Sequence, residues 1–194
     1  MTPRLLLPAA ALLTLAACSD SSPGAAPAPS TAPPPAATVG APGSACELPV
    51  TLGLAESWKP KAVELAADDP LAELARRGPL TMACEIDAKP AGNIGFLRVW
   101  TGAGQDPRAA LQAFLGTDAV SPAFTDVTIG GKPAVEVVYQ SRSRLDDELE
   151  KERAFAVPTA EGLVAVVLDS FDDVEHEQMI PAYELAKSTL TVTG

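Results

Sequence analysis

Apolar and polar residues alternate over short stretches along most of the chain after residue 46, a pattern typical of β-strands with one buried face. These stretches are rich in β-branched and aromatic residues, and turns containing Gly, Pro, Asn or Asp separate them. Two of the turns, at 130–131 and 158–162, are short enough to join neighbouring strands as hairpins. We therefore expect strands at residues 49–54, 61–65, 80–87, 95–100, 124–129, 134–139, 153–157 and 163–171.

Two short segments carry the signals of a helix N-terminus, an aspartate in the capping position followed by a proline. Asp69-Pro70 predicts a helix at 71–77, which Gly78 would end. Asp106-Pro107 predicts a second helix, whose apolar residues share one face and so indicate packing on a sheet. This apolar face consists of Ala110, Leu111, Phe114 and Leu115, and Gly116 follows it.

A third helix is predicted to start at Asp172-Asp173 and to run through Leu190. Pro181 lies inside this segment, so we expect it to kink the helix or to mark its true first turn. Strands joined by short turns form an antiparallel sheet, and helices in the middle and at the end of the chain must cover it. The predicted fold class is therefore α+β, mainly antiparallel β-sheet covered by helices.

The first residues have the pattern of an export signal. Arg4 precedes an apolar run at 5–17, which is too short for the roughly 20 residues of a membrane-spanning helix and suits a signal peptide at 1–17. The run ends in Leu15-Ala16-Ala17-Cys18, which resembles a bacterial lipobox, in which the cysteine thiol receives a diacylglycerol before cleavage. We predict lipidation of Cys18 and stable membrane anchoring by two or three acyl chains. The alternative is a secreted protein cut after Ala17.

Residues 18–45 then consist almost wholly of Ala, Pro, Ser, Thr and Gly, and predict a lipidated cysteine followed by a disordered tether. The remaining residues, 46–194, have the length of one domain. The formal net charge is −11, and removal of 1–17 takes away Arg4 and leaves −12. This acidity argues against nucleic acid as a partner of the folded part.

The chain has three cysteines, so two remain once Cys18 is set aside. In an oxidising compartment we expect Cys46 and Cys84 to pair in a disulfide. The alternative is two buried thiols. A metal site is disfavoured because two cysteines without CxxC spacing lack further ligands.

His176 is the chain's one histidine and stands among carboxylates from Asp172 to Glu177. It could ligate a metal or act as a base, or it could belong to a solvated first helical turn whose acidic residues complement the helix dipole. Position 180 is Ile, so the HExxH pattern fails, and Gly130-Gly131-Lys132 lacks the rest of a phosphate-binding loop. We expect no catalytic residue, no metal and no cofactor.

Residues 142–153 lie between two predicted strands and contain many charged side chains of both signs. We interpret this segment as a solvated loop whose charges pair with one another, each pair contributing little to stability. If the domain contacts a protein partner, Leu145 and Leu149 on this hairpin are candidates for the contact.

The order of the expected elements resembles the PsbP-like α/β/α sandwich of actinobacterial lipoproteins of the LpqN and LpqT type, over about residues 48–192. The resemblance rests on a few stretches: the opening strand ending at Trp58, the hairpin into 95–100, the helix after Asp106-Pro107, the turn 129–134, and the closing strand and helix around Tyr183. It implies an envelope lipoprotein with a binding or scaffolding role rather than catalysis, and supplies no catalytic residues.

Our leading functional hypothesis is a lipid-anchored, noncatalytic binding or scaffold domain outside the plasma membrane, held to the membrane by the lipid on Cys18. Its partner would be an envelope protein or a lipid ligand. A carrier of apolar small molecules is an alternative and would require a cavity under the helices. A hydrolase or metal-dependent enzyme using His176 is a further alternative of another class.

Overall fold

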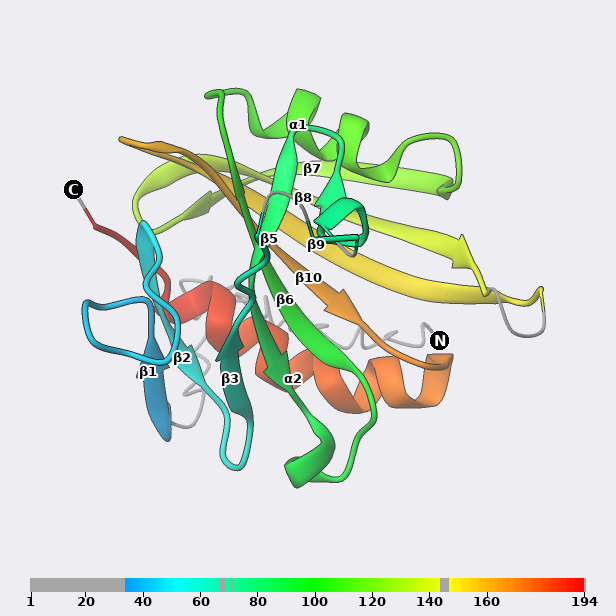
Figure 1. Cartoon of the computed structure of the whole chain (residues 1–194). Coiled ribbons are helices and arrows are strands. Elements are labelled where there is room, and N and C mark those ends of the chain that lie inside the picture. The colour runs from blue at the N-terminus through cyan, green and yellow to red at the C-terminus, as the bar shows by residue number, and fades with distance from the viewer. Residues whose placement is uncertain (1–33, 67–68, 71, 144–146, 194) are drawn as a thin grey trace, which may run out of the picture. The chain divides into compact units, whose positions relative to one another are not determined.

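The structure is a computed structural model that describes residues 34–66, 69–70, 72–143 and 147–193. Its main element is an antiparallel sheet with strand order β3-β5-β6-β10-β9-β8-β7, and the short β4 pairs with β5 beside β3 (Figure 1). The strands of this main sheet are β3 (Lys59–Ala62), β4 (Arg76–Arg77), β5 (Leu80–Asp87), β6 (Phe96–Gly102), β7 (Val120–Ile129), β8 (Lys132–Arg142), β9 (Leu149–Thr159) and β10 (Gly162–Asp169). The α+β fold class predicted from the sequence is confirmed.

The central strands are buried on both faces, which explains the nearly continuous apolar run of β10. Because side chains alternate along a strand, odd and even positions of β10 enter different cores. Val164, Val166 and Leu168 belong to the first core, and Leu163, Ala165 and Val167 belong to the second. The main sheet therefore separates two hydrophobic cores.

The last helix and a small second sheet cover the first face. Helix α2 (Asp173–Thr189) packs against the small sheet, which has the order β1-β2-β11, and against β9 and β10 of the main sheet. The strands of the small sheet are β1 (Ala37–Val39), β2 (Val50–Leu54) and β11 (Thr191–Val192). Tyr183 of α2 meets Phe155 of β9 edge to face, with ring centroids 5.5 Å apart. Helix α2 begins at Asp173, so Pro181 does not mark its first turn.

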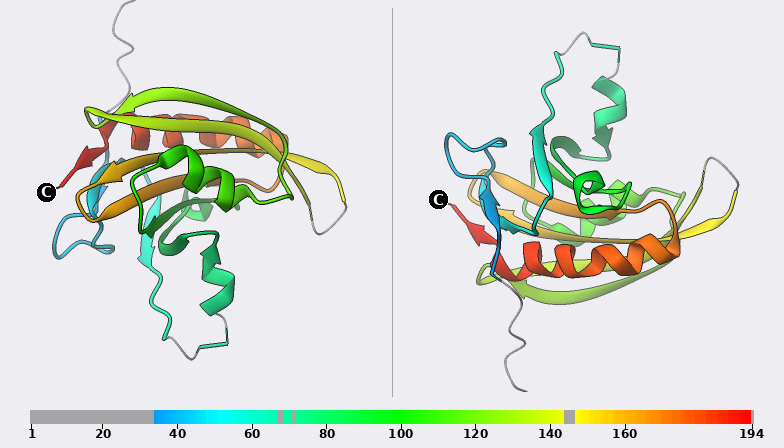
Figure 2. Two further views of the ribbon diagram at one scale, coloured as in Figure 1. Left: turned by 90° about the horizontal axis from the view of Figure 1, so that it is seen from above. Right: turned by 90° about the horizontal axis from the view of Figure 1, so that it is seen from below.

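Helix α1 (Pro107–Leu115) lies on the opposite face of the main sheet, as the views in Figures 1 and 2 show. The Asp106 side chain caps it by accepting hydrogen bonds from the backbone N–H groups of Arg108 and Ala109, each at 3.0 Å. Leu111 and Phe114 are buried against the sheet, as predicted. A helix of nine residues is only about 14 Å long. It therefore covers part of this face and leaves the rest open.

A disulfide joins Cys46, which follows β1 in the chain, to Cys84 of β5, as expected from the sequence. The two Cα atoms are 5.9 Å apart, and both residues are buried in the first core. The bond therefore connects the N-terminal part of the domain covalently to the main sheet.

Three expectations about the first half of the domain are wrong. Folded structure starts before residue 46, because β1 lies within the segment expected to be tether and pairs with β2. The helix expected at 71–77 does not form over its described residues, 72–77: a single 3-10 turn, η1 (Ala72–Ala75), leads directly into β4. The strand expected at 61–65 is displaced to Lys59–Ala62, where it pairs with β5.

Candidate functional site: an open pocket on the main sheet

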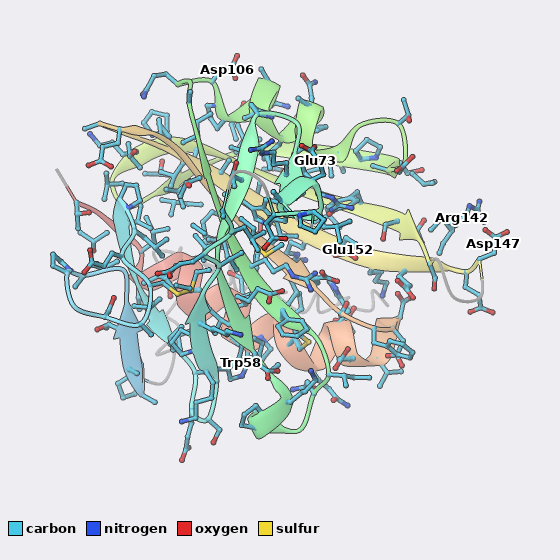
Figure 3. The ribbon with its side chains drawn as sticks, viewed as in Figure 1. Trp58, Glu73, Asp106, Arg142, Asp147 and Glu152 are labelled. Carbon is cyan, nitrogen blue, oxygen red and sulfur yellow. A yellow bond between two sulfur atoms is a disulfide. The ribbon has the colours of Figure 1, made fainter. Side chains whose placement is uncertain are left out.

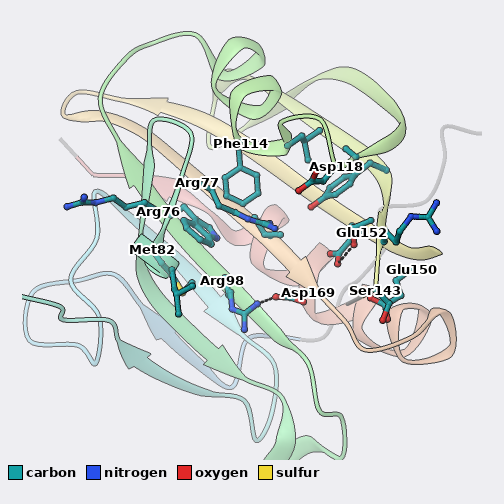
Figure 4. A pocket seen from close by; sticks show the side chains of 18 of the residues that line it. Arg76, Arg77, Met82, Arg98, Phe114, Asp118, Ser143, Glu150, Glu152 and Asp169 are labelled. Carbon is teal, nitrogen blue, oxygen red and sulfur yellow. Dashed lines mark hydrogen bonds and ion pairs between the residues drawn. The ribbon is translucent and has the colours of Figure 1, made fainter. Parts of the chain in front are cut away.

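A pocket of about 640 Å³ lies on the face of the main sheet that carries α1, over the part that this helix leaves open (Figure 4). This is the size of cavity that takes a drug-sized ligand. Strands β4, β5, β6, β8, β9 and β10 contribute to its lining, together with the end of α1 and the residues that follow it. Its lining includes Glu73, Leu74, Arg76, Arg77, Met82, Arg98, Trp100, Phe114, Leu115, Asp118, Ala119, Tyr139, Ser141, Arg142, Glu150, Glu152 and Asp169.

Aromatic side chains form one wall of the pocket. Trp100 of β6 meets Phe114 of α1 edge to face, with ring centroids 5.0 Å apart. The guanidinium carbon of Arg77 lies 5.1 Å from the centroid of the Phe114 ring, a cation–π contact. Trp100 and Tyr139 are buried, whereas Arg77 is exposed to solvent. The Phe114 ring therefore lies between a buried indole and an exposed cation.

Two buried polar atoms in the lining lack hydrogen-bond partners within the described residues. One is the indole Nε1 of Trp100, and the other is Oε2 of Glu152, a residue that is only 7% exposed. The other carboxyl oxygen of Glu152 accepts a hydrogen bond of 3.2 Å from the Ser141 hydroxyl. Buried polar groups in folded proteins nearly always have partners, so the indole N–H and this carboxyl oxygen are hydrogen-bonding groups that the described residues leave unused.

Burial controls the ionisation of two acidic groups in the polar floor of the pocket, the carboxyl group of Glu152 and the phenol of Tyr139. The pKa of Glu152 is raised from 4.5 to about 8, mainly by the loss of solvent on burial and to a lesser extent by the charge of Glu150, while the Ser141 hydrogen bond and the charge of Arg77 oppose the rise. Burial likewise raises the pKa of Tyr139, with the charge of Glu152 adding to the effect. At neutral pH, Glu152 is thus mainly a neutral carboxylic acid, and Tyr139 keeps its proton.

Ion pairs occupy most of the remaining charges around the pocket. Arg98 pairs with Asp169, and its Nε lies 2.9 Å from the Glu85 carboxylate. Arg76 pairs with Glu73 at 3.0 Å. Arg77 differs from its neighbours, because no carboxylate among the described residues forms an ion pair with it.

His176 is not part of this pocket. This residue of α2 is buried, with 2% of its surface exposed, and its Nδ1 is 3.2 Å from the Ser170 hydroxyl. Burial lowers the pKa of His176, and the nearby Arg153 guanidinium adds to the effect. The interpretation of this segment as a solvated helical turn is therefore wrong for His176.

The structure divides the charged segment 142–153 differently from the sequence analysis. Strand β8 ends at Arg142 and strand β9 begins at Leu149. Figure 3 shows Arg142 and Asp147 at the tip of the hairpin that these strands form, away from Glu152 on the sheet. Leu149 is exposed, at 38%, whereas Leu145 lies outside the described residues. Glu152 is buried rather than solvated, which corrects its assignment to a solvated loop.

Cys18 and the signal peptide at 1–17 also lie outside the described residues. Within the part of the chain that the structure describes, no three His, Cys, Asp or Glu residues are grouped so that they could hold a metal ion. Neither α1 nor α2 is both long and apolar enough to cross a bilayer.

The sequence analysis missed all the polar residues of the pocket floor. A signal existed for Glu152, because it stands two and four residues before Ala154 and Ala156, which belong to the second core. Residues two apart in a strand share a face, so Glu152 is in phase with buried positions. Arg77 offered no comparable signal, because pairing of β4 with β5 places it in the pocket.

The fold and the pocket define a class of protein: an α+β domain with an open ligand-sized pocket on one face of its sheet. Comparison of the sequence with family models narrows this class to one family. A family model described as "Uncharacterised lipoprotein" matches residues 16–190, a region that includes Cys18, and the chain belongs to this family. No match was found among curated proteins.

A search of solved structures finds the crystal structure of LpqN, described as involved in cell envelope biogenesis of Mycobacterium tuberculosis. The sequence identity is 16% and the TM-score is 0.41, and the alignment covers 75% of this chain and 83% of LpqN. LpqN belongs to the type of lipoprotein that the order of elements in the sequence resembles.

Proposed function

We propose that this chain is a noncatalytic binding protein of the cell envelope, anchored by a lipid on Cys18 to the outer face of the plasma membrane, and that the pocket beside α1 holds its ligand. Membership of a lipoprotein family and the lipobox-like Leu15–Cys18 sequence support the anchoring. An envelope binding protein also agrees with the description of LpqN as a protein of envelope biogenesis.

The observation that carries the ligand-binding role is the pair of unpartnered buried atoms, Trp100 Nε1 and Glu152 Oε2, in a pocket of about 640 Å³. Leaving a buried polar group without a hydrogen bond costs about 1 to 3 kcal/mol. A domain with no ligand would lose nothing by replacing Glu152 with an apolar residue, whereas a ligand-binding domain needs polar groups at such positions to orient its ligand.

The proposal is tested by filling the pocket. The mature chain is purified with Cys18→Ser, so that no lipid is attached, and small molecules released on denaturation are identified by mass spectrometry. Ala119→Phe places a ring in the pocket lining, while Ala109→Phe places the same ring on the exposed face of α1.

We expect a copurifying molecule in the unblocked protein and in Ala109→Phe, and its loss from Ala119→Phe. Equal recovery from both variants would show that the pocket is not the binding site. Circular dichroism of both variants checks that the fold is intact.

A further inference from the structure

We propose that the ligand of this pocket is a monocarboxylate with an aliphatic tail, whose carboxylate is held by Arg77 and the Trp100 indole N–H beside the carboxyl group of Glu152. This inference rests on the proposed function and adds the chemical class of the ligand.

The head group must accept hydrogen bonds, because the unpartnered groups nearest the aromatic wall are donors. The Trp100 indole N–H can only donate, and so can the Arg77 guanidinium. Arg77 is held over the Phe114 ring and has no ion-pair partner among the described residues. An organic cation would meet these donors and gain nothing from them. An anion would supply the acceptor that both groups lack.

The charge of the head group is limited by the rest of the lining. Four arginines line the pocket, together with four carboxylates besides Glu152. With Glu152 neutral, these charges balance, so there is no excess of positive charge to hold a dianion. A guanidinium binds a carboxylate through two parallel N–H···O bonds, which makes a single carboxylate the fitting anion.

Glu152 can take part in binding an anion because it is a neutral acid at neutral pH. A carboxylic acid and a carboxylate at short distance share one proton, as paired acidic residues do. The proton of Glu152 would then lie between its unpartnered oxygen and the ligand. The charged and titratable groups that face or adjoin Glu152 are Arg77 of β4, Arg98 of β6, Tyr139 of β8, Glu150 of β9 and Asp169 of β10.

The tail is inferred from the apolar side of the pocket. Leu74 of η1 lines the pocket and, at 71%, is the most exposed large apolar side chain among the described residues. Met82, Leu115 and Ala119 also line it and are partly buried. An aliphatic chain that leaves the polar floor along these residues would cover Leu74 and bury its surface.

Three chain-matched probes test the head group: octanoate, octanamide and octylammonium. Trp100 reports binding by its fluorescence in the Trp58→Phe variant, because Trp58 lies in the first core and would add a signal unrelated to the pocket. The mature Cys18→Ser chain serves as the protein. We expect octanoate to bind at least tenfold more tightly than octanamide, and octylammonium to bind most weakly.

Variants of Arg77 and Glu152, which the proposal places beside the ligand's carboxylate, test the head group further. Arg77→Met should weaken octanoate by about tenfold or more and leave octanamide nearly unchanged. Arg108→Met is the matched control, because Arg108 also lies over an aromatic ring, Phe124 at 5.4 Å, but outside the pocket. Octanoate should weaken by about tenfold between pH 7 and pH 9 as Glu152 ionises, whereas Glu152→Gln should bind it equally at both.

The outcomes separate this inference from the proposed function. Tighter binding of octanamide or octylammonium than of octanoate, or equal losses for all three probes in Arg77→Met, would overturn the carboxylate while keeping a binding pocket. Failure of octanoate to change Trp100 fluorescence at millimolar concentration would also overturn it. The proposed binding role of the pocket falls if Ala119→Phe retains the copurifying molecule.

Discussion

The carboxylate of Glu175, in the first turn of α2, accepts a hydrogen bond of 2.6 Å from the backbone N–H of Phe171, four residues earlier. Its other oxygen accepts from the backbone N–H groups of Ile94 and Gly95, in the turn between β5 and β6, the second of them at 3.1 Å. One buried side chain therefore fixes two loops and the start of a helix. Sequence inspection assigned it only to an acidic first turn.

Replacing Glu175 tests this connection. Glu175→Gln turns one acceptor into a donor facing backbone N–H groups, so we expect a loss of about 1 to 3 kcal/mol in the free energy of unfolding, measured by urea denaturation. Glu177→Gln is the control, because Glu177 is exposed and pairs with Lys151 on the surface. Its effect should be much smaller, and similar losses in both variants would contradict a special role for Glu175.

The disulfide is tested in the native protein and by mutation. Alkylation of the unreduced, denatured mature domain should find neither Cys46 nor Cys84 free. The bond closes a chain segment with a sequence separation of 38, so the double variant Cys46→Ser, Cys84→Ser should lose about 4 kcal/mol of stability on the chain-entropy model. Alkylation of both cysteines without reduction would refute the bond.

The ionisation of Glu152 makes stability depend on pH. Its pKa is about 8 in the folded protein and 4.5 without burial, so between these values the folded state binds more protons than the unfolded state. Stability must then fall as pH rises through this window, by up to about 1.4 kcal/mol per pH unit. His176 has the opposite sign, because its pKa is lowered by folding.

Comparison with Glu152→Gln isolates this contribution. The amide resembles the neutral acid and does not titrate, and the effect of His176 cancels between the two proteins. We expect the variant to gain stability relative to wild type as pH rises from 5 to 8, in guanidinium denaturation at each pH. A constant difference across this range would mean that Glu152 is ionised in the folded protein.

Lipid attachment is tested by metabolic labelling. Cells expressing the full chain should incorporate labelled fatty acid into it, and Cys18→Ala should abolish the label, because only the thiol can form the thioether. Cys46→Ala offers a control, as this residue is disulfide-bonded within the domain. Label that survives Cys18→Ala would place the lipid elsewhere or exclude it.

Local sequence signals predict elements of this fold where tertiary pairing does not compete. Asp106-Pro107 starts α1 as expected, with the aspartate capping two backbone N–H groups. Asp69-Pro70 carries the same signal, yet Arg76 and Arg77 pair with Thr81 and Leu80 of β5 instead of continuing a helix. Hydrogen bonds within a sheet outweigh a cap when the helix they interrupt is so short.

The pocket was less predictable than the fold, because it depends on contacts between distant residues. Arg77, Phe114 and Trp100 come together from β4, α1 and β6, and no spacing in the sequence relates them. Burial of Glu152 was predictable in principle from its phase in β9. The charges around it suggested solvent instead, since runs of alternating charge are usually exposed.

The packing of α1 is the most direct test of both the sandwich and the pocket. Phe114 is 4% exposed and contacts Trp100 edge to face, so Phe114→Ala removes a core aromatic and should cost about 3 to 5 kcal/mol. Gln112→Ala, on the exposed face of the same helix, should change stability by no more than about 0.5 kcal/mol. Urea denaturation of the two variants measures both values.

Phe114→Ala should also release Arg77 from its cation–π contact, so it should weaken octanoate binding, whereas Gln112→Ala should not. Equal, small effects on stability would mean that α1 does not pack on the sheet, and the wall of the pocket would be lost with it.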